Sequence, residues 1–440
     1  MSKSPHPSRV PYLVYSDKDG NIFEDEHLEA VGRSGMNVYP LQPEDFILLP
    51  EGSDLFTLPG RFPYGRDPET GEIELREDVQ AVAALVSPAN TQTYLAAFGT
   101  DEENAPVLPL YAYSALGWLD GEFYCTAVRI DPDIRQDFVQ FDREKIIEQT
   151  KKSLEAHPGN RLVQHLGNNC SLRYNCPAAR NYFAGRWECP IPVSPACNSN
   201  CLGCISFQPE EHEMSSPQDR LTFIPSVDEI LEYTVPHLQT AEGAIVSFGQ
   251  GCEGEPLLVW QLMRDAIIKI REKTPRGIIN INSNGSKPAA VEELMKAGLN
   301  SLRISLNSVR KHIYEGYYLP NNYVFEDLRE SARIVRKYGG WVSINYFVFP
   351  GMTDQQEEFD ALCEFIRYTD ISMIQWRNFN IDPDWYLGKL GISELPESIG
   401  VKNMMVKIRE EFPHLAFGYF NPNSEVQAKW KQGMAHQLPA

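Results

Sequence analysis

The sequence carries little positive charge for its length and has no long apolar run. Lysine and arginine total 40 against 60 aspartate and glutamate residues, which gives a formal net charge of −20 over 440 residues. Such an acidic surface repels phosphate backbones. No segment approaches the roughly 18 apolar residues that cross a membrane, and residues 1–11 lack the apolar centre of a secretory signal. We therefore expect a cytoplasmic protein that binds neither nucleic acid nor membrane.

Internal repeats and low-complexity segments are also missing. The hydrophobic content of 42% and the charged content of 23% are those of an ordinary soluble globular protein. The length is sufficient for one large domain and a smaller one.

The first part of the chain, residues 1–159, is expected to form a β-rich N-terminal accessory domain. Turn sequences at 17–20 and at 120–121 each lie between short segments of β-forming residues, which is typical of hairpins. Asp142 then begins a helix expected over 143–157. No motif here indicates a reaction, so substrate binding or a lid is the role we expect.

Three thiols lie close together in the middle of the chain, at Cys197, Cys201 and Cys204. Thiolates select zinc, copper(I) or iron–sulfur clusters. Three thiolates are one short of the four that closed zinc sites and ordinary ferredoxin clusters use. The spacing is therefore compatible with a metal centre that leaves one position open, although a zinc knuckle is an alternative.

From residue 188 to residue 380 the pattern alternates between strands and helices. Such alternation predicts a parallel sheet with helices outside it, here a partial (β/α)6 barrel. Right-handed crossovers place all carboxyl ends of the strands at one mouth. The expected strands are 191–193, 244–248, 277–282, 301–306, 341–349 and 372–377, and the expected helices are 226–238, 257–273, 288–297, 323–337 and 354–368.

Polar and small residues gather at that predicted mouth. Gly254 and Glu255 follow the second strand, and Ser283 and Asn284 end the third. The later strands contribute Ser305, Asn307, Asn345, Gln375 and Arg377. Each has a structural alternative. Gly254-Glu255-Pro256 and Ser283-Asn284-Gly285 are also common turns, and the amides of Asn345 and Gln375 are equally compatible with a packed core. Arg377 is also compatible with an ion pair to Asp382 or Asp384.

Together these motifs resemble the radical S-adenosylmethionine (SAM) superfamily over about residues 188–380. The CxxxCxxC loop is similar to the family's cluster motif, Gly254-Glu255-Pro256 to the end of its GGEP motif, and Ser283-Asn284-Gly285 to its TNG-like strand end. The segment 303–308 also resembles a fourth-strand segment of the family. Gly251-Cys252-Glu253 departs from the family's glycine run.

The resemblance implies a cofactor site. Cys197, Cys201 and Cys204 would hold a [4Fe-4S] cluster, and Glu255 would receive the SAM amino group, with Glu253 as a second acceptor. The other implied SAM contacts are Gly254, Ser283, Asn284, Ser305, Asn307 and Asn345. No catalytic residue is assigned.

The bridge of residues 160–187 and the start of the next strand hold further cysteines. Cys170, Cys176 and Cys189 are compatible with an auxiliary iron–sulfur cluster, with Cys125 or His165 as its fourth ligand. Buried cysteine acting as a small apolar side chain is the alternative. Residues 381–440 are expected to be a C-terminal extension with a helix over 398–412 and a strand over 414–419.

The function that the resemblance implies is reductive cleavage of SAM to a 5′-deoxyadenosyl radical, followed by hydrogen abstraction from an unidentified small-molecule substrate. A reductant such as flavodoxin or ferredoxin would supply the electron. Modification of a peptide or protein side chain is the first alternative. A non-catalytic iron–sulfur or zinc protein is the second.

Overall fold

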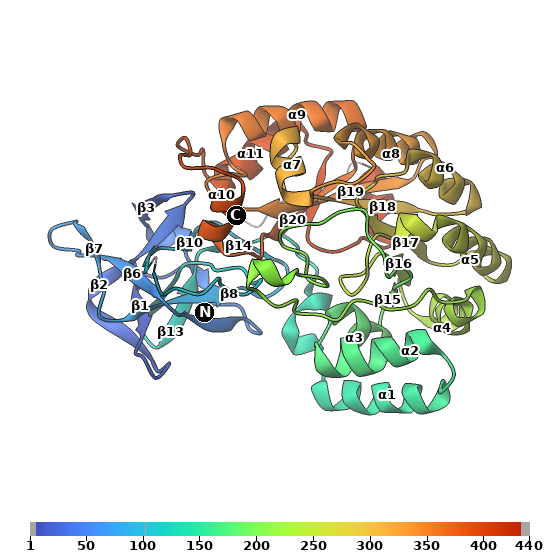
Figure 1. Cartoon of the computed structure of the whole chain (residues 1–440), viewed down its shortest axis with the longest axis horizontal. Coiled ribbons are helices and arrows are strands. Elements are labelled where there is room, and N and C mark those ends of the chain that lie inside the picture. Colours follow the sequence, from blue (N-terminus) through green and yellow to red (C-terminus); the bar gives the residue numbers. More distant parts are fainter. Residues whose placement is uncertain (1–5, 102, 433–440) are drawn as a thin grey trace.

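The chain folds into a β-rich N-terminal region and a larger α/β region that lie side by side (Figure 1). The structure is a computed structural model, and it describes residues 6–101 and 103–432. Across those two ranges, the helices are too short or too polar to span a membrane.

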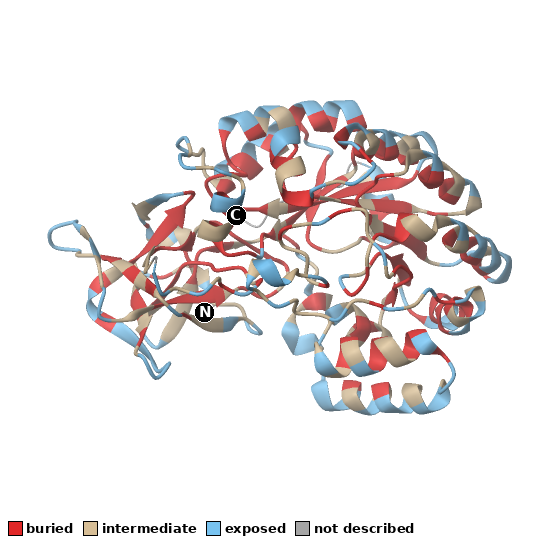
Figure 2. Cartoon of the chain, viewed as in Figure 1, coloured by how far each residue is buried: buried red, intermediate tan, exposed pale blue. Residues whose placement is uncertain are grey.

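The α/β region is built on a parallel sheet of seven strands that pair in chain order. Figure 2 shows these strands buried, while the helices outside them expose one face. The sheet consists of β15 (Glu188–Ile191), β16 (Ile245–Phe248), β17 (Ile278–Ser283), β18 (Ser301–Leu306), β19 (Trp341–Val348), β20 (Met373–Asn378) and β21 (Ala416–Gly418).

Helices connect successive strands on the outer side of this sheet. The Ser226 hydroxyl and the Glu229 side chain form the capping box that starts the first of them, as the sequence predicts. The predicted α/β architecture is confirmed. The helices are α4 (Val227–Thr240), α5 (Trp260–Lys273), α6 (Pro288–Ala297), α7 (Lys311–Tyr318), α8 (Phe325–Lys337), α9 (Gln356–Thr369), α10 (Pro383–Lys389), α11 (Val401–Glu411) and α12 (Ser424–Lys431).

The sheet is strongly curved. A flat sheet of seven strands would separate its first and last strands by roughly 29 Å, at about 4.8 Å per neighbour. Yet Cys197, in the loop after β15, and Tyr419, directly after β21, line the same cavity. The curvature therefore brings the carboxyl ends of all the strands around one space.

Two predictions about this region need correction. The barrel was expected to have six strands, but the strand expected at 414–419 joins the sheet as β21 and pairs in parallel with β20. The first strand was expected at 191–193, but β15 begins at Glu188. The predicted extension is therefore part of the sheet, because β21 adds a hydrogen-bonded edge to β20.

The N-terminal region contains a 12-stranded antiparallel sheet and a separate pair formed by β9 and β14. Both predicted hairpins are present, at β1–β2 and at β12–β13. The strands are β1 (Tyr12–Ser16), β2 (Ile22–Ser34), β3 (Asn37–Pro40), β4 (Ile47–Leu48), β5 (Asp54–Leu58), β6 (Arg61–Arg66), β7 (Ile73–Leu75), β8 (Gln80–Leu85), β9 (Asn90–Gln92), β10 (Leu95–Ala96), β11 (Phe98–Thr100), β12 (Leu116–Leu119), β13 (Glu122–Cys125) and β14 (Ala127–Arg129).

The bridge between the two regions is helical, which the sequence did not predict. Asp142 caps α1 (Arg143–Ala156) as expected, accepting a hydrogen bond from the backbone N–H of Lys145 at 3.1 Å. The chain continues through α2 (Arg161–His165), the π-helix η4 (Leu166–Arg173) and α3 (Pro177–Phe183). These elements lie beside β15 at one side of the sheet.

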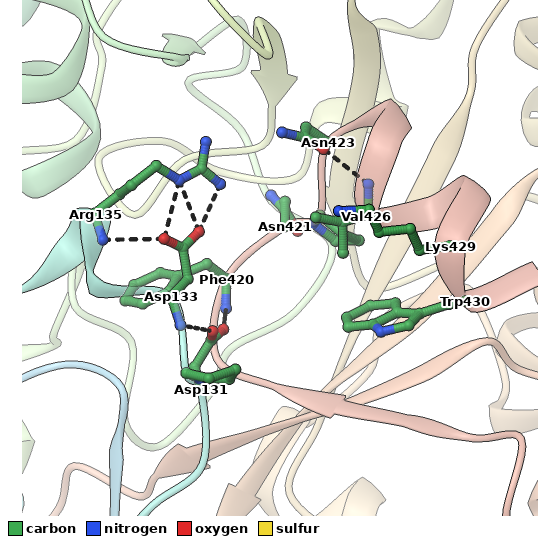
Figure 3. Close-up of a pocket in the computed structure, with 11 residues that line it drawn as sticks. Asp131, Asp133, Arg135, Phe420, Asn421, Asn423, Val426, Lys429 and Trp430 are labelled. Atoms are coloured by element: carbon green, nitrogen blue, oxygen red, sulfur yellow. Dashed lines mark hydrogen bonds and ion pairs between the residues drawn. The ribbon is translucent and has the colours of Figure 1, made fainter. Parts of the chain in front are cut away.

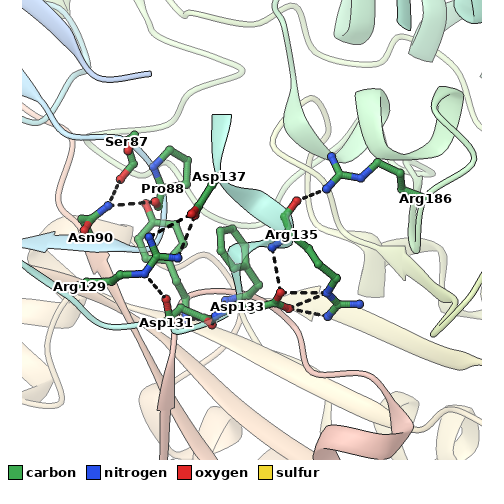
Figure 4. A network of polar contacts seen from close by, with 11 residues as sticks. Ser87, Pro88, Asn90, Arg129, Asp131, Asp133, Arg135, Asp137 and Arg186 are labelled. Carbon is green, nitrogen blue, oxygen red and sulfur yellow. Dashed lines mark hydrogen bonds and ion pairs between the residues drawn. The ribbon is translucent and has the colours of Figure 1, made fainter. Parts of the chain in front are cut away.

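Polar contacts join the N-terminal region to the far side of the sheet. The Asp131 carboxylate accepts hydrogen bonds from the backbone N–H groups of Tyr419 at 2.8 Å and Asp133 at 3.0 Å. Figure 4 shows Asp131 next to Asp133, whose carboxylate forms an ion pair with Arg135. The segment after β14 therefore fixes the end of β21.

A buried ion pair also crosses this junction. Arg61 Nη2 lies 2.8 Å from Asp382 Oδ2, and the two side chains are 4% and 1% exposed. Asp382 also accepts from the N–H of Leu108 at 2.9 Å and caps α10. Since both charges are removed from water, each depends on the other.

We expect Arg61→Ala to destabilise the chain by about 3–5 kcal/mol, because it leaves the Asp382 carboxylate buried without its counter-ion. The matched control is Lys152→Gln, which removes an ion pair whose side chains are 70% and 64% exposed and should cost less than about 1 kcal/mol. Thermal unfolding of both variants is the measurement. Equal melting temperatures would show that the buried pair is dispensable.

Candidate functional site

A cavity of about 390 Å³ lies at the carboxyl ends of the parallel strands. Its walls come from the loops after β15 and β16 and from the ends of β17 to β21. All seven strands of the parallel sheet therefore lead into it. Of the predicted site residues, those lining it are Cys197, Cys201, Gly254, Glu255, Ser283, Asn284, Ser305 and Asn345. Eight of the ten residues predicted for the cofactor site therefore lie together at this cavity, whereas Cys204 and Asn307 are not part of its lining.

The loop that carries the three predicted cluster cysteines rests on α7. The backbone N–H of Leu202 donates to the Tyr317 carbonyl at 3.0 Å, and the N–H of Asn200 donates to the Tyr318 carbonyl at 3.1 Å. Gly203 faces the same helix, and a Cβ there would lie 2.8 Å from the Tyr317 hydroxyl. The residue between the second and third cysteines therefore has to be small.

The thiols of this loop are mostly shielded from water. Burial raises the pKa of Cys197 to about 11, with a contribution from Glu255. Burial also raises the pKa of Cys201, and the neighbouring thiols add to the effect. Metal binding would therefore release protons from these groups.

Cys204 has a polar environment that the sequence motif did not indicate. Arg220 Nη2 lies 3.3 Å from its sulfur, and the Ser206 hydroxyl lies 3.7 Å away. Arg220 precedes α4 in a loop without secondary structure, so no sequence periodicity pointed to it.

Glu255 lies at the centre of the polar wall and is 4% exposed. Its carboxylate accepts hydrogen bonds from the Ser283 hydroxyl at 2.6 Å and from the Asn284 N–H at 2.9 Å. It also caps the turn before α5 through the Leu257 N–H at 2.9 Å. Burial raises its pKa, while these three donors oppose the shift. The predicted residues Ser283 and Asn284 thus orient Glu255.

Glu253, the other acceptor considered, faces a different direction. Its carboxylate accepts from the backbone N–H groups of Val193 at 2.7 Å, Ser194 at 2.9 Å and Gln250 at 2.6 Å. It does not line the cavity. Burial raises its pKa to about 8. Glu253 therefore joins the end of β15 to the loop after β16, and Glu255 is the carboxylate available at the cavity.

The loop after β16 also touches the cysteine loop directly. The Gly254 N–H donates to the Ser194 carbonyl at 2.7 Å, and the Glu255 N–H donates to the Ala196 carbonyl at 2.8 Å. A Cβ on Gly254 would lie 2.0 Å from the Ala196 oxygen. Gly254 is therefore needed for this close approach, which places Glu255 beside Cys197.

The third strand end holds the cysteine loop from the other side. The Asn284 amide donates to Asn198 Oδ1 at 2.8 Å and to the Ser199 hydroxyl at 3.2 Å. Because the backbone of Asn284 also binds Glu255, one residue links the two parts of the proposed cofactor site.

β18, α7 and β19 each contribute a buried polar atom that lacks a partner among the described residues. Over the described residues, Arg303 Nε, Tyr318 Oη and Asn345 Oδ1 are buried without a hydrogen-bond partner. All three residues line the cavity. Buried polar atoms in proteins are usually satisfied, so these three are suited to a polar ligand.

Two predicted residues lie away from the cavity. The Asn307 amide donates to the Ile313 carbonyl at 3.3 Å and to the Tyr386 hydroxyl at 3.1 Å, beneath α7. The Gln375 side chain binds Arg303 and Asn421. Both side chains come from strand ends, as expected, but they point into the packed interior, so we leave Asn307 out of the proposed SAM contacts.

Arg377 does not form the ion pair considered for it. Asp382 pairs with Arg61, and Asp384 pairs with Arg33 at 2.5 Å. Arg377 instead donates to the Tyr419 carbonyl at 2.9 Å, and its guanidinium lies over the Tyr419 ring. β21 thus positions Arg377 at the cavity wall, which required the unpredicted seventh strand.

The auxiliary ligand set expected from sequence is not the one that the structure brings together. Cys189 lies within β15, and Cys125 lies in the N-terminal sheet. Among the described residues, the ligand atoms of His165 and Cys170 instead approach Cys252, which follows β16. Spacing along the bridge could not reveal a partner from a distant loop.

A second cavity, of about 330 Å³, lies between the segment 131–135 and the C-terminal residues 420–430. Figure 3 shows Asp131 and Asp133 on one side of it, with Asn423 and Lys429 on the other. Its lining contains none of the predicted cofactor residues.

Comparison with family models identifies the central part of the chain. Residues 191–366 match the model of the radical SAM superfamily. Residues 191–366 are a radical SAM domain. Comparison with curated proteins finds no match.

Solved structures similar to this chain include three that cover half of it or more. Methylornithine synthase is 14% identical, with a TM-score of 0.37 over 67% of this chain and 83% of its own. The hydrogenase maturase HydG from Carboxydothermus hydrogenoformans is 13% identical, with a TM-score of 0.37 over 67% and 74%. SuiB from Streptococcus suis, bound to S-adenosylmethionine, is 18% identical, with a TM-score of 0.32 over 52% and 51%.

The residues present fit the cofactors that the radical SAM superfamily implies. Three thiols that leave one metal position unfilled suit a cluster with an open iron. A buried carboxylate beside that loop suits an ammonium group, because a buried charge needs a partner. The unpartnered atoms of Arg303, Tyr318 and Asn345 suit further polar groups of a bound ligand.

Proposed function

We propose that Cys197, Cys201 and Cys204 bind a [4Fe-4S] cluster and that Glu255 binds the amino group of SAM. Once bound, the pair would supply reductive cleavage of SAM to a 5′-deoxyadenosyl radical, which abstracts hydrogen from a substrate. The observation that carries the proposal is the meeting of the cysteine loop, Glu255 and the strand-end amides at one cavity.

The chain's own residues would act by holding these groups in place. Ser283 and Asn284 orient Glu255 through hydrogen bonds at 2.6 and 2.9 Å. The aromatic side chains of Tyr317, Phe347 and Phe379 pack against one another at the cavity. Such a wall limits water and keeps the substrate close to the reacting atoms.

Two arginines at the cavity favour a substrate with an anionic group. Arg303 and Arg377 both line it, and their charges repel each other. Burial, together with Arg377, lowers the pKa of Arg303 to about 9, although Glu188 opposes this shift. The single carboxylate of Glu188 therefore balances the charges of two guanidinium groups, Arg303 and Arg377. A carboxylate or phosphate on the substrate would complete the balance of charge.

The substrate proposal is a small molecule of this anionic class. A peptide side chain is the alternative substrate. The two proposals are distinguished by whether an anionic small molecule or a peptide increases the rate of turnover. The electron would come from a flavodoxin or ferredoxin.

Release of 5′-deoxyadenosine is the test of this function. We expect the anaerobically reconstituted enzyme, given SAM and dithionite, to release it slowly alone and at least about tenfold faster with its substrate. Carboxylate and phosphate metabolites should stimulate release, whereas the methyl esters of the same carboxylates should not.

Stimulation by the esters as well would contradict the anionic substrate but leave SAM cleavage standing. Absence of any 5′-deoxyadenosine from an enzyme with a full cluster would contradict the proposed function itself.

A further inference from the structure

A second group of metal-binding side chains lies outside the SAM cavity. It consists of His165 at the end of α2, Cys170 in η4 and Cys252 in the loop after β16. Their ligand atoms all lie within 4.8 Å of one another. None of the three lines the SAM cavity, so this group is separate from the proposed cluster site.

The π-helix explains how His165 and Cys170 come together. An α-helix turns residues five apart to different faces, but a π-helix bonds each residue to the fifth one along and aligns them. The Tyr174 N–H donates to the Asn169 carbonyl at 2.9 Å, which is such a bond. Segments of this kind are rare and occur frequently at functional sites.

Both thiols are buried, and a nitrogen of His165 is available. Cys170 is 1% exposed and Cys252 is 3% exposed. The Nε2 atom of His165 is buried without a hydrogen-bond partner in ranges 6–101 and 103–432, whereas Nδ1 lies 3.3 Å from the Asn169 amide. A histidine that binds a metal through Nε2 donates the N–H of Nδ1 to an acceptor. Asn169 can supply that acceptor when its amide is flipped so that the oxygen faces Nδ1.

The spacing of the donors favours a single ion. Around a tetrahedral zinc ion, with Zn–S of about 2.3 Å, two donor atoms lie roughly 3.8 Å apart. In an iron–sulfur cubane each thiolate binds its own iron, so the donors lie further apart. The ligand atoms of His165, Cys170 and Cys252 lie within 4.8 Å of one another, a spacing that suits one shared ion.

The donor types select zinc among common ions. Two thiolates and an imidazole are borderline-soft ligands, whereas magnesium and calcium require oxygen ligands. We propose that His165, Cys170 and Cys252 bind one zinc ion. This site joins the bridge helices to the loop that carries Glu253 and Glu255, and it does not depend on the proposed SAM chemistry.

A surface cavity lies next to this group of side chains. His165 lines a cavity of about 570 Å³ together with Ser206 and Arg220, the residues that contact Cys204. A third thiol belongs to Cys176, whose backbone N–H donates to the Cys170 carbonyl at 2.8 Å. His165 therefore places one edge of the group at this surface cavity, while both thiols of that group are buried.

The test is metal analysis of full-length variants reconstituted with iron and sulfide in the presence of zinc. We expect one zinc ion and about four iron atoms per chain in the wild type. The double variant Cys170→Ser/Cys252→Ser should lose at least about tenfold in zinc and keep its iron. The triple variant Cys197→Ala/Cys201→Ala/Cys204→Ala should lose its iron and keep its zinc.

The matched control is Cys125→Ser/Cys363→Ser, which removes two buried thiols elsewhere and should keep both metals. Should the Cys170→Ser/Cys252→Ser chain fail to fold, cobalt replaces zinc in the triple Ala variant. A thiolate-to-cobalt charge-transfer band there supports the site, and its absence overturns it. Wild-type chain without zinc, or iron retained by the triple Ala variant, also overturns it.

Discussion

Replacing Cys197, Cys201 and Cys204 together with Ala should abolish 5′-deoxyadenosine release and lower the iron content by about four atoms per chain. The reason is that, among the described residues, the thiols that line the SAM cavity are Cys197 and Cys201, with Cys204 in the same loop. Iron and sulfide analysis after anaerobic reconstitution is the measurement, with the visible absorption of the cluster as a second readout.

Two controls separate cluster loss from misfolding. The triple variant should keep its circular dichroism spectrum, since the loop is held mainly by backbone bonds to α7. The Cys189→Ala variant should keep its iron, because Cys189 lies within β15. Full iron content in the triple variant would refute the assignment of these cysteines.

Glu255→Gln should weaken SAM binding by about 2–5 kcal/mol, since a charged ligand group would lose its buried partner. This corresponds to at least about a 30-fold rise in Kd. The substitution keeps the shape of the side chain, and its one oxygen replaces one of the two that accept from Ser283 and from the Asn284 N–H. Equilibrium binding of SAM to the reconstituted chain is the measurement, and the iron content should not change.

Glu253→Gln is the matched control for this prediction. Its carboxylate binds three backbone N–H groups and does not line the cavity. We therefore expect SAM affinity within about threefold of wild type but a lower melting temperature, because an amide replaces an acceptor of three donors. The reverse pattern, with Glu253→Gln alone losing SAM, would shift the ammonium contact to Glu253.

The strand ends were predictable because their polar residues interrupt apolar runs. Ser283-Asn284 ends the hydrophobic segment of β17, and Glu255 follows that of β16 after a glycine-containing turn. Parallel topology alone then places them at one edge. The role of these residues relative to one another was not predictable, since the hydrogen bonds that orient Glu255 depend on side-chain direction in the folded chain.

Other features depended on tertiary contacts that local sequence does not encode. β21 is only three residues long and becomes a strand by pairing with β20. α7 contains a glycine and three tyrosines, which are weak helix formers, and its burial against the cysteine loop stabilises it. The grouping of Cys252 with the bridge required knowledge of two distant elements at once.

The junction between the two regions has a consequence for the order of events during synthesis. Arg33 meets Asp384, Arg61 meets Asp382, and Asp131 meets the backbone of Tyr419. The N-terminal strands leave the ribosome first, but their partners are hundreds of residues away along the chain, and contacts of such separation form slowly. The nascent N-terminal sheet therefore lacks these contacts until residue 419 has left the ribosome. Arg377 is held by Tyr419, which directly follows β21. A metal centre inserted before the chain leaves the ribosome would therefore enter a cavity that still lacks the side formed by β21.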